Sequence, residues 1–378
     1  MELVEENSVK IKVEIPKKDV HAKMEVFYNP LMKSNRNISV LLLNSVDNKK
    51  MNLALPLAGS GIRGLRFLQE LEKGKINHLF LNDKKDNFVK MFNENLKLNK
   101  ISKAKENSIS VFNQEASLFL LNLTEEQNIK DFCGYFDYID LDPFGSPNPF
   151  LSVTLARITR KGIIAITATD TAALTGTYPK VTKRKYWARS MRNDLMHEIG
   201  LRILIRKVQL HGVQFDKALV PILSYHKDHY FRVYFVSNKG KENSDEVIKE
   251  HQYLLSCPKC LSFKISNYNQ ENCSCGWKYD YAGPLWTGKL FDQKLLQAML
   301  KNNPFPEEEK FLQLLNDEMD TPFFYDLHAL SKKYKTDPPK MELALKKLKG
   351  TRTHFSLTGL KTEKSLKEVL KVVLSSKK

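Results

Sequence analysis

A glycine-rich loop between an apolar segment and a helical pattern constrains the fold of this chain most strongly. Residues 51–58 are mostly apolar, and residues 59–64 read Gly-Ser-Gly-Ile-Arg-Gly, which is the spacing G-x-G-x-x-G. Leucine and phenylalanine then recur at helical spacing over residues 65–71. A second apolar segment, residues 76–82, ends at Asp83, at the distance that a nucleotide-binding βαβ unit requires. The sequence therefore predicts an α/β fold with a Rossmann-like parallel sheet.

Two ligands suit this loop. A dinucleotide would place its pyrophosphate on the helix N-terminus, whereas S-adenosylmethionine has ribose, adenine and a carboxylate but no phosphate. A third strand over residues 108–112 leads to Glu115 and Ala116, and no hydride-acceptor site is evident. Asp83 suits ribose hydroxyls, and Arg63 suits bidentate pairing with the methionine carboxylate. The sequence favours S-adenosylmethionine, with a nicotinamide enzyme as the alternative.

A carboxylate, a rigid turn and an aromatic ring follow a further apolar strand at residues 136–141. Asp142 accepts hydrogen bonds, Pro143 fixes its own φ and lacks an N–H, and Phe144 offers a stacking face. A carboxylate that accepts the N–H of an exocyclic base amine helps that nitrogen to act as a nucleophile. The motif indicates chemistry on such an amine. The alternative is an ordinary strand-to-loop exit built from turn-forming residues.

Several segments in the same order resemble the archaeal tRNA guanine-26 N2-dimethyltransferases. The most specific is Asp140-Leu141-Asp142-Pro143-Phe144-Gly145-Ser146-Pro147. The others are Val26 to Arg36, Gly61 to Arg66, Ala168 to Asp170, Ala282 to Trp286, and Arg352 to Ser356 followed by Thr358 and Gly359.

This resemblance implies a class I methyltransferase that adds one or two methyl groups from S-adenosylmethionine to N2 of guanine at tRNA position 26. Asp142 would face the target amine, and the guanine would leave its helical stack to lie against Phe144, with Phe27 helping to shape the pocket. Arg66 stays an alternative to Arg63 as the main cofactor contact, and Asn37 stands where the family is expected to have Asp. The residues implied to contact the cofactor are Arg36, Arg63, Asp83, Glu115 and Ala116.

The charge of the chain agrees with an RNA substrate. Sixty Lys and Arg residues face 43 Asp and Glu residues, a formal net charge of +17. The densest basic segment is residues 180–207, where Tyr186 and Trp187 are available for stacking. A solvated helix face is the alternative. The residues predicted to grip phosphates are Lys183, Arg184, Lys185, Arg189 and Arg192.

Four cysteines are spaced as two metal-binding knuckles. Cys257 and Cys260 form a C-x-x-C pair, and Cys273 and Cys275 form a tighter C-x-C pair. This spacing predicts one structural zinc ion, with a reduced or lost site as the alternative. Cys133 is expected to be a buried thiol.

The length predicts two domains. We expect a methyltransferase domain at residues 1–240 and, after a polar linker, a smaller α+β domain at residues 241–378 that binds tRNA and carries the cysteine insertion. No apolar run reaches the roughly 20 residues of a membrane helix, and the N-terminus is acidic. The protein is therefore expected to be soluble and cytoplasmic, with tRNA as partner and no obligate protein partner.

Two other functions remain open on the sequence alone. One is methylation of adenine in RNA or DNA, because residues 142–144 partly imitate the acid-Pro-Pro-aromatic motif of those enzymes. The other is a non-catalytic zinc-containing RNA-binding protein. Such a protein would have no reason to keep Arg63, Asp83 and Asp142 in a cofactor-compatible order.

Overall fold

The computed structural model describes residues 2–13, 28–124 and 127–375, so Val26 and Phe27 lie outside the described residues. The chain forms two compact units. Unit 1 comprises Met1–Ala168, Tyr234–Lys239 and Ala298–Glu308, and unit 2 comprises Thr169–Val233, Gly240–Gln297 and Glu309–Lys378. No helix within the described ranges is long and apolar enough to cross a membrane.

A parallel sheet organises unit 1. Its strands run in the order β5-β4-β3-β6-β7, with β3 pairing in parallel with both β4 and β6. This order confirms the predicted Rossmann-like arrangement. The chain adds β4 and β5 on one side of β3 and then returns to add β6 and β7 on the other side, so the strand order switches between β3 and β6. The strands are β3 (Met51–Leu55), β4 (Ile76–Asn82), β5 (Ile109–Phe112), β6 (Phe136–Leu141) and β7 (Ile158–Ala168).

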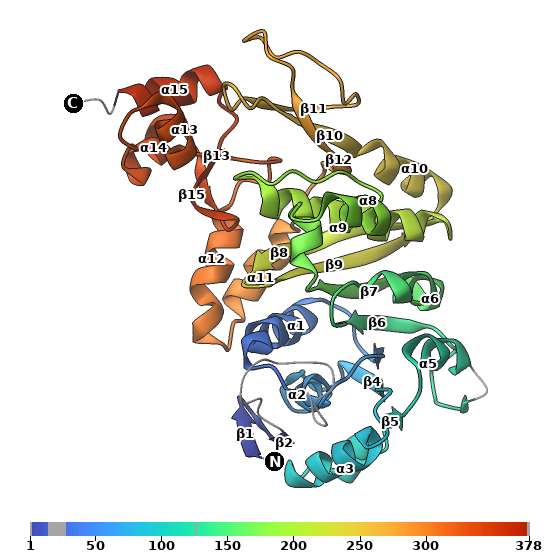
Figure 1. Ribbon diagram of the computed structural model, residues 1–378. Helices are drawn as coiled ribbons and strands as arrows, with labels where there is room; N and C mark the ends of the chain where they lie inside the picture. The colour runs from blue at the N-terminus through green and yellow to red at the C-terminus, as the bar shows by residue number, and fades with distance from the viewer. Residues whose placement is uncertain (1, 14–27, 125–126, 376–378) are drawn as a thin grey trace. The chain divides into compact units, whose positions relative to one another are not determined.

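Helices cover both faces of these strands. In Figure 1, α1 and α2 lie on one side of the sheet and α5 and α6 on the other, as expected when each parallel connection passes through a helix. A hairpin of β1 (Glu2–Glu6) and β2 (Val9–Val13) packs on α2 and α3. The helices are α1 (Lys33–Ser45), α2 (Ile62–Glu70), α3 (Phe88–Leu98), α4 (Lys103–Glu106), α5 (Ala116–Asn122) and α6 (Leu151–Arg157), with the 3-10 turns η1 (Pro30–Met32), η3 (Asn148–Phe150) and η4 (Pro306–Glu308).

Geometry favours two glycines at the start of α2, the N-cap Gly61 and Gly64 in the first turn. Gly61 has φ +75°, a left-handed conformation that glycine adopts at little cost. A Cβ at Gly64 would lie 2.3 Å from Cδ2 of Leu81, so only glycine lets α2 approach β4 this closely. Strands β3 and β6 are buried along almost their whole length, which explains their near-continuous apolar sequences.

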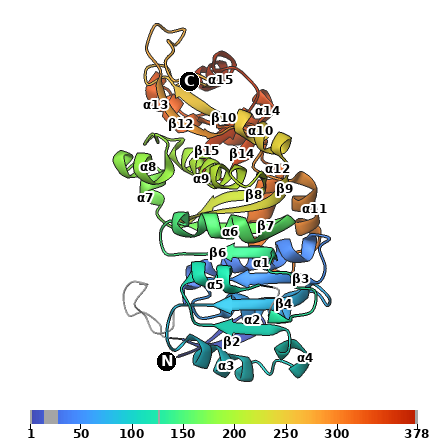
Figure 2. The ribbon, with the colours of Figure 1, turned by 90° about the vertical axis from the view of Figure 1, so that its right-hand side faces the viewer.

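The first part of unit 2 is built from helices and a hairpin. The strands β8 (Lys217–Lys227) and β9 (Tyr230–Lys239) are joined by two residues and complete the sheet order β5-β4-β3-β6-β7-β9-β8. The last six residues of β9 belong to unit 1. The helices are α7 (Thr171–Leu174), α8 (Pro179–Tyr186), α9 (Met196–Val213) and α10 (Lys241–Lys249), seen from a second direction in Figure 2.

Two small sheets and further helices complete unit 2. An antiparallel sheet, β11-β10-β12, carries the cysteines, and a second one, β13-β15-β14, packs with α13, α14 and α15. Leu330, Leu348 and Leu360 lie in the core of this C-terminal part. The elements are β10 (His251–Ser256), β11 (Phe263–Ser266), β12 (Asp280–Trp286), α11 (Gln293–Lys301, whose end belongs to unit 1), α12 (Glu309–Asp317), β13 (Tyr325–Asp326), α13 (Leu327–Tyr334), α14 (Met341–Leu348), β14 (Thr351–Thr353), β15 (Ser356–Lys361) and α15 (Leu366–Leu374).

A buried ionic network anchors the C-terminal signature within unit 2. His354 Nδ1 lies 2.6 Å from Glu318, and Lys361 lies 3.0 Å from Glu318 and 3.4 Å from Glu198. Arg202 pairs with Glu198 at 2.9 Å. Burial alone would raise the pKa of Glu318, but His354 and Lys361 outweigh it and lower the pKa well below its usual range. The network gives His354 a structural role, because the buried Glu318 carboxylate holds its ring in place.

Candidate active site and cysteine cluster

The carboxyl ends of four neighbouring strands bring the predicted site residues to one edge of the unit 1 sheet. The glycine loop follows β3, Asp83 follows β4, Glu115 comes three residues after β5, and Asp142 follows β6. Parallel strands point their carboxyl ends the same way, so this edge is where ligands bind in open α/β sheets.

Asp83 is tied to the glycine loop. Its Oδ2 accepts the N–H of Gly59 at 2.8 Å, and its Oδ1 accepts the N–H of Lys85 at 3.1 Å. These bonds fix the carboxylate while each oxygen keeps a further lone pair. Because a ribose diol offers two O–H donors, Asp83 fits the nucleoside part of S-adenosylmethionine.

Asn82, which was not singled out from the sequence, joins two loops of the same edge. Its side-chain amide donates 3.0 Å bonds to the carbonyls of Pro56 and Gln114, and its oxygen accepts the N–H of Gln114 at 2.9 Å. Glu115 accepts the N–H groups of Ser117 and Leu118 and so caps α5. Ala116 is buried at the first position of that helix. The loop after β5 is thus held in register with the glycine loop.

Arg63 and Asp142 form an ion pair at the centre of this edge. Nη2 of Arg63 donates to Oδ2 of Asp142 at 2.5 Å, and Nη1 lies 3.5 Å from Asp140. The same guanidinium donates to Ser39 at 2.8 Å and to Asn35 at 2.9 Å, both on α1. Arg63 is therefore held on several sides and in turn holds one oxygen of Asp142.

The Asp142 carboxylate and the Phe144 ring reach solvent. The side chain of Asp142 is 23% exposed and Phe144 is 52% exposed, while Arg63 is 7% exposed. Pro143 lies between Asp142 and Phe144, and Gly145 turns the chain with φ +82°. An aromatic face beside a fixed carboxylate suits a planar base that offers an N–H group.

Arg36 and Arg66 meet elsewhere in unit 1, on the buried carboxylate of Glu6. Arg36 contacts it through two bonds of 2.7 and 2.5 Å, and Arg66 contacts it at 2.9 Å and also pairs with Glu70. Burial alone would raise the pKa of Glu6, but the two arginines outweigh it and lower it. Tyr28 donates to the same carboxylate at 3.0 Å. No pattern in the sequence marked Glu6, which stands in an acidic N-terminal stretch far along the chain from its partners.

Asn37, where the resembled family is expected to have Asp, lies on α1 away from the Asp142 pair. Its amide donates to Glu308 at 3.0 Å and to Glu307 at 3.2 Å, and its oxygen accepts from Asn7. An aspartate here would place a third carboxylate beside two others. The amide is therefore suited to this position because it can donate to both glutamates.

The predicted phosphate-binding residues gather on α8 and the segment after it. Lys183, Arg184, Lys185 and Arg192 are exposed. Lys185 lies 3.4 Å from Asp170. These residues present positive charge to solvent from one part of unit 2.

Arg189 and Trp187 differ from their neighbours. Arg189 pairs with Asp280 at 2.6 Å and lies over the ring of Tyr281, so it fixes the start of β12. Trp187 is 51% exposed, and Lys207 Nζ lies 2.9 Å from the centre of its ring. Tyr186 is buried and donates to Asp170 at 2.5 Å, so it is not available for stacking.

The four cysteines converge on one point. Their sulfurs all lie within 4.8 Å of one another, and two of the pairs, Cys257 with Cys275 and Cys260 with Cys273, are 3.5 Å apart. Metal–sulfur bonds of about 2.3 Å in a tetrahedral zinc site require sulfurs slightly under 4 Å apart. The C-x-C knuckle thus fits the metal as well as the C-x-x-C knuckle does. Cys133, expected to be buried, is exposed because it lies in the loop before β6.

Burial and hydrogen bonding shift the pKa values of two of these thiols in opposite directions. Burial raises the pKa of Cys257. Burial acts in the same direction on Cys273, but hydrogen bonds from the Cys275 N–H, Ser262 and Tyr279 outweigh it and lower the pKa of that thiol. A bound cation stabilises all four thiolates together.

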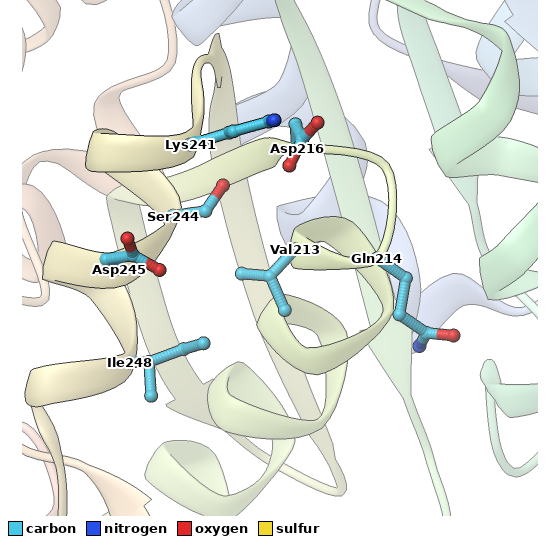
Figure 3. A pocket seen from close by; sticks show the side chains of 7 residues that line it. All are labelled: Val213, Gln214, Asp216, Lys241, Ser244, Asp245 and Ile248. Carbon is cyan, nitrogen blue, oxygen red and sulfur yellow. The ribbon is translucent and has the colours of Figure 1, made fainter.

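A separate shallow cavity of about 350 Å³ lies between the end of α9 and the start of α10 (Figure 3). Figure 3 shows side chains of mixed character around it, with Lys241 and Asp216 at one end and Ile248 at the other. None of the residues predicted for chemistry, RNA or metal lines it. It is therefore not part of the sites described above.

Comparisons with known proteins agree with this geometry. The family model described as N2,N2-dimethylguanosine tRNA methyltransferase matches residues 7–374. The chain is 39% identical to the tRNA (guanine(26)-N(2)/guanine(27)-N(2))-dimethyltransferase of Aquifex aeolicus, over 98% of this chain and 95% of the relative. It is 36% identical to the tRNA (guanine(26)-N(2))-dimethyltransferase of Pyrococcus furiosus, over 96% of each.

A solved structure is similar over its whole length. Trm1 from Pyrococcus horikoshii, in complex with S-adenosyl-L-methionine, superposes with a TM-score of 0.85 and 31% sequence identity. The superposition covers 98% of this chain and 99% of that chain. Both units therefore have counterparts in a single solved relative.

Proposed function

Because the chain belongs to the N2,N2-dimethylguanosine tRNA methyltransferase family, we propose that it methylates tRNA at N2 of guanine 26. The methyl donor is S-adenosylmethionine, and one or two methyl groups are added. The observation that carries the proposal is the ion pair of Arg63 and Asp142 at the carboxyl edge of the sheet, beside the exposed ring of Phe144.

Three residues of the strand ends suit the nucleoside of the cofactor. Asp83 would accept the ribose hydroxyls, and Glu115 with Ala116 would lie beside the adenine, in register through Asn82. Arg63 is the arginine of this edge that can reach a methionine carboxylate, since Arg66 is fully buried between Glu6 and Glu70. Arg36 contributes by holding Glu6 and the N-terminal hairpin in place. When bound, S-adenosylmethionine supplies an electrophilic methyl group on sulfur.

Asp142 orients the amine and takes its proton. The Arg63 guanidinium holds Oδ2, so Oδ1 is the oxygen that accepts a hydrogen from N2 of the guanine. This bond draws N2 out of conjugation with the ring and directs its lone pair. Phe144 stacks on the extruded base, and most of the acceleration comes from positioning. The proton released from N2 passes to Asp142.

Unit 2 supplies the RNA contacts. Lys183, Arg184, Lys185 and Arg192 bind phosphates, and Arg189 orders the neighbouring strand through Asp280. We assign methyl transfer to residues 1–240. We assign a further part of tRNA recognition to residues 241–378. We also propose that the protein acts in the cytoplasm, where its tRNA substrate is found.

Labelled methyl transfer to an unmodified tRNA transcript, followed by nucleoside analysis, tests this function. We expect N2-methylguanosine and N2,N2-dimethylguanosine, both lost when guanine 26 is replaced by adenine. Methylated guanosine at position 27 of the substituted transcript would show that the enzyme also modifies the second position named for the Aquifex aeolicus relative. Methylated adenosine in the unsubstituted transcript would contradict the proposal and favour an adenine methyltransferase.

A further inference from the structure

The sheet that carries the cysteines also exposes two aromatic rings. Trp277 is 52% exposed and Tyr268 is 74% exposed, both in the loop that joins β11 to β12 (Figure 1). Exposed aromatic rings on one loop offer flat faces on which a planar ligand can stack. Trp286 of the same sheet is instead a buried tryptophan. It is 6% exposed and donates its indole N–H to the carbonyl of Lys289.

The backbone of Trp277 is fixed by the cysteine turn. Cys273 donates its N–H to the carbonyl of Trp277 at 2.8 Å, and Gly276 donates to the carbonyl of Cys273 at 2.9 Å. Asn272 and Lys278 form a bridge across the same turn. Cys273 and Cys275 lie in this turn, so the metal that they fit would hold Trp277 as well. A ring on a rigid turn loses little conformational entropy when a ligand stacks on it.

The charge around Trp277 favours an anionic ligand. Lys259 Nζ lies 5.6 Å from the centre of the Trp277 ring, and Lys278 directly follows Trp277 in the chain. The two acidic residues nearby already have cationic partners, because Glu271 pairs with Lys264 and Asp280 pairs with Arg189. A ring with an ammonium group beside it matches the two parts of a nucleotide, a planar base and a phosphate.

We propose that Trp277, with Lys259 and Lys278, forms a stacking platform for an unpaired nucleotide of the RNA substrate. Tyr268 provides a second ring on the same loop. The base stacks on the indole, and the lysines contact the flanking phosphates. The contact is tolerant of sequence, because every base has a π face. This inference rests on the proposed tRNA substrate for the identity of the RNA.

Replacement of Trp277 tests the platform against a matched variant that keeps a ring. Trp277→Ala is expected to weaken tRNA binding about tenfold, whereas Trp277→Phe recovers most of the affinity. At saturating tRNA the rate of methyl transfer is unchanged, and the salt dependence of binding is unchanged because no phosphate contact is lost. Metal content and melting temperature equal to those of the wild type verify that the variants fold. Equal tRNA affinity in the Ala variant would overturn the proposal.

Fluorescence gives an independent readout. In a Trp187→Phe background, Trp277 is the exposed tryptophan and Trp286 is buried. Titration with tRNA is expected to quench the emission, and the quenching disappears when Trp277 is also changed to Phe. Emission that tRNA leaves unaltered would refute the stacking.

These outcomes separate the platform from the proposed reaction. Quenching and weaker binding without any methyl transfer by the wild type would reject the reaction and keep the platform. Normal methyl transfer with unchanged tRNA affinity in Trp277→Ala would reject the platform and keep the reaction.

Discussion

The strand edge of unit 1 and the cysteine lobe of unit 2 (residues 251–286) each gather functional side chains, but by different means. At the strand edge, the backbone ladders of a parallel sheet place Asp83 and Asp142, and buried hydrogen bonds complete their positions. In the lobe, three short paired strands carry loops whose four cysteine sulfurs lie close together. The edge is therefore organised by the protein alone, whereas the lobe depends on what its thiols bind.

The largest effect is expected from the carboxylate of the strand edge. Asp142→Ala removes the acceptor of the N2 hydrogen, and the rate of methyl transfer should fall about a thousandfold. Binding of tRNA should stay within about twofold, because the phosphate contacts lie on other residues. Single-turnover kinetics and a binding titration measure the two quantities. Asp86→Ala, an exposed acid of the same unit, serves as the control and should retain full activity. An equal loss of rate and of tRNA affinity would show that Asp142 acts in folding or docking.

Removal of metal should affect the cysteine lobe of unit 2. A strong chelator, or Cys260→Ser, is expected to lower the melting temperature by about 5–10 °C, because the cysteine lobe loses the cation that stabilises its thiolates. Binding of S-adenosylmethionine should be unaffected, since its proposed residues all lie in unit 1. Calorimetry with metal analysis checks this. Cys133→Ser is the matched control, because this cysteine lies outside the cluster. A zinc-free protein with an unchanged melting temperature would contradict the structural role of the metal.

Two arginines of α2, Arg63 and Arg66, allow a comparison within unit 1. Arg63→Lys keeps the charge but loses the fork that spans Asp142, Asn35 and Ser39, so we expect the maximal rate to fall about 10- to 100-fold. Arg66→Lys is its counterpart and should lower the melting temperature without a comparable loss of rate, because its partners are Glu6 and Glu70. A rise in KM for S-adenosylmethionine with an unchanged maximal rate in Arg63→Lys would make Arg63 a cofactor contact alone.

The smallest effect is expected at the basic surface. Lys183→Ala with Arg184→Ala should weaken tRNA binding about tenfold and reduce the slope of log affinity against log salt by about 1 to 2. The control pair is Lys49→Ala with Lys50→Ala, two adjacent exposed cations of unit 1 that lie outside the segments assigned to RNA binding. Affinity measured over a range of salt concentrations decides. An equal loss of tRNA affinity in both double variants would show that the α8 residues act only through the net charge of the protein.

The sequence was sufficient to locate the candidate residues that follow the strand ends. Asp83, Glu115 and Asp142 could be predicted because apolar runs mark the strands and the carboxyl ends of parallel strands share an edge. The cysteine spacing likewise predicted the cluster. The fold class followed from the glycine loop, whose Gly64 is required by the approach of Leu81.

The partners of the arginines could not be predicted, because they depend on contacts between distant segments. Arg66 meets Glu6 from 60 residues away, and Arg63 meets Asp142 from 79 residues away. No periodicity marks such pairs. The compact units also interleave, since residues 234–239 and 298–308 return to unit 1, and a linear reading of composition gives no sign of that.

Inosine at position 26 tests the central claim most directly, because it differs from guanosine only by the absence of the 2-amino group. The measurement is methyl transfer at position 26 of a tRNA that carries inosine there, beside the unmodified transcript. We expect that this tRNA still binds and that transfer at position 26 is abolished. Undiminished methylation at inosine 26 would show that N2 is not the acceptor and would contradict the role assigned to Asp142.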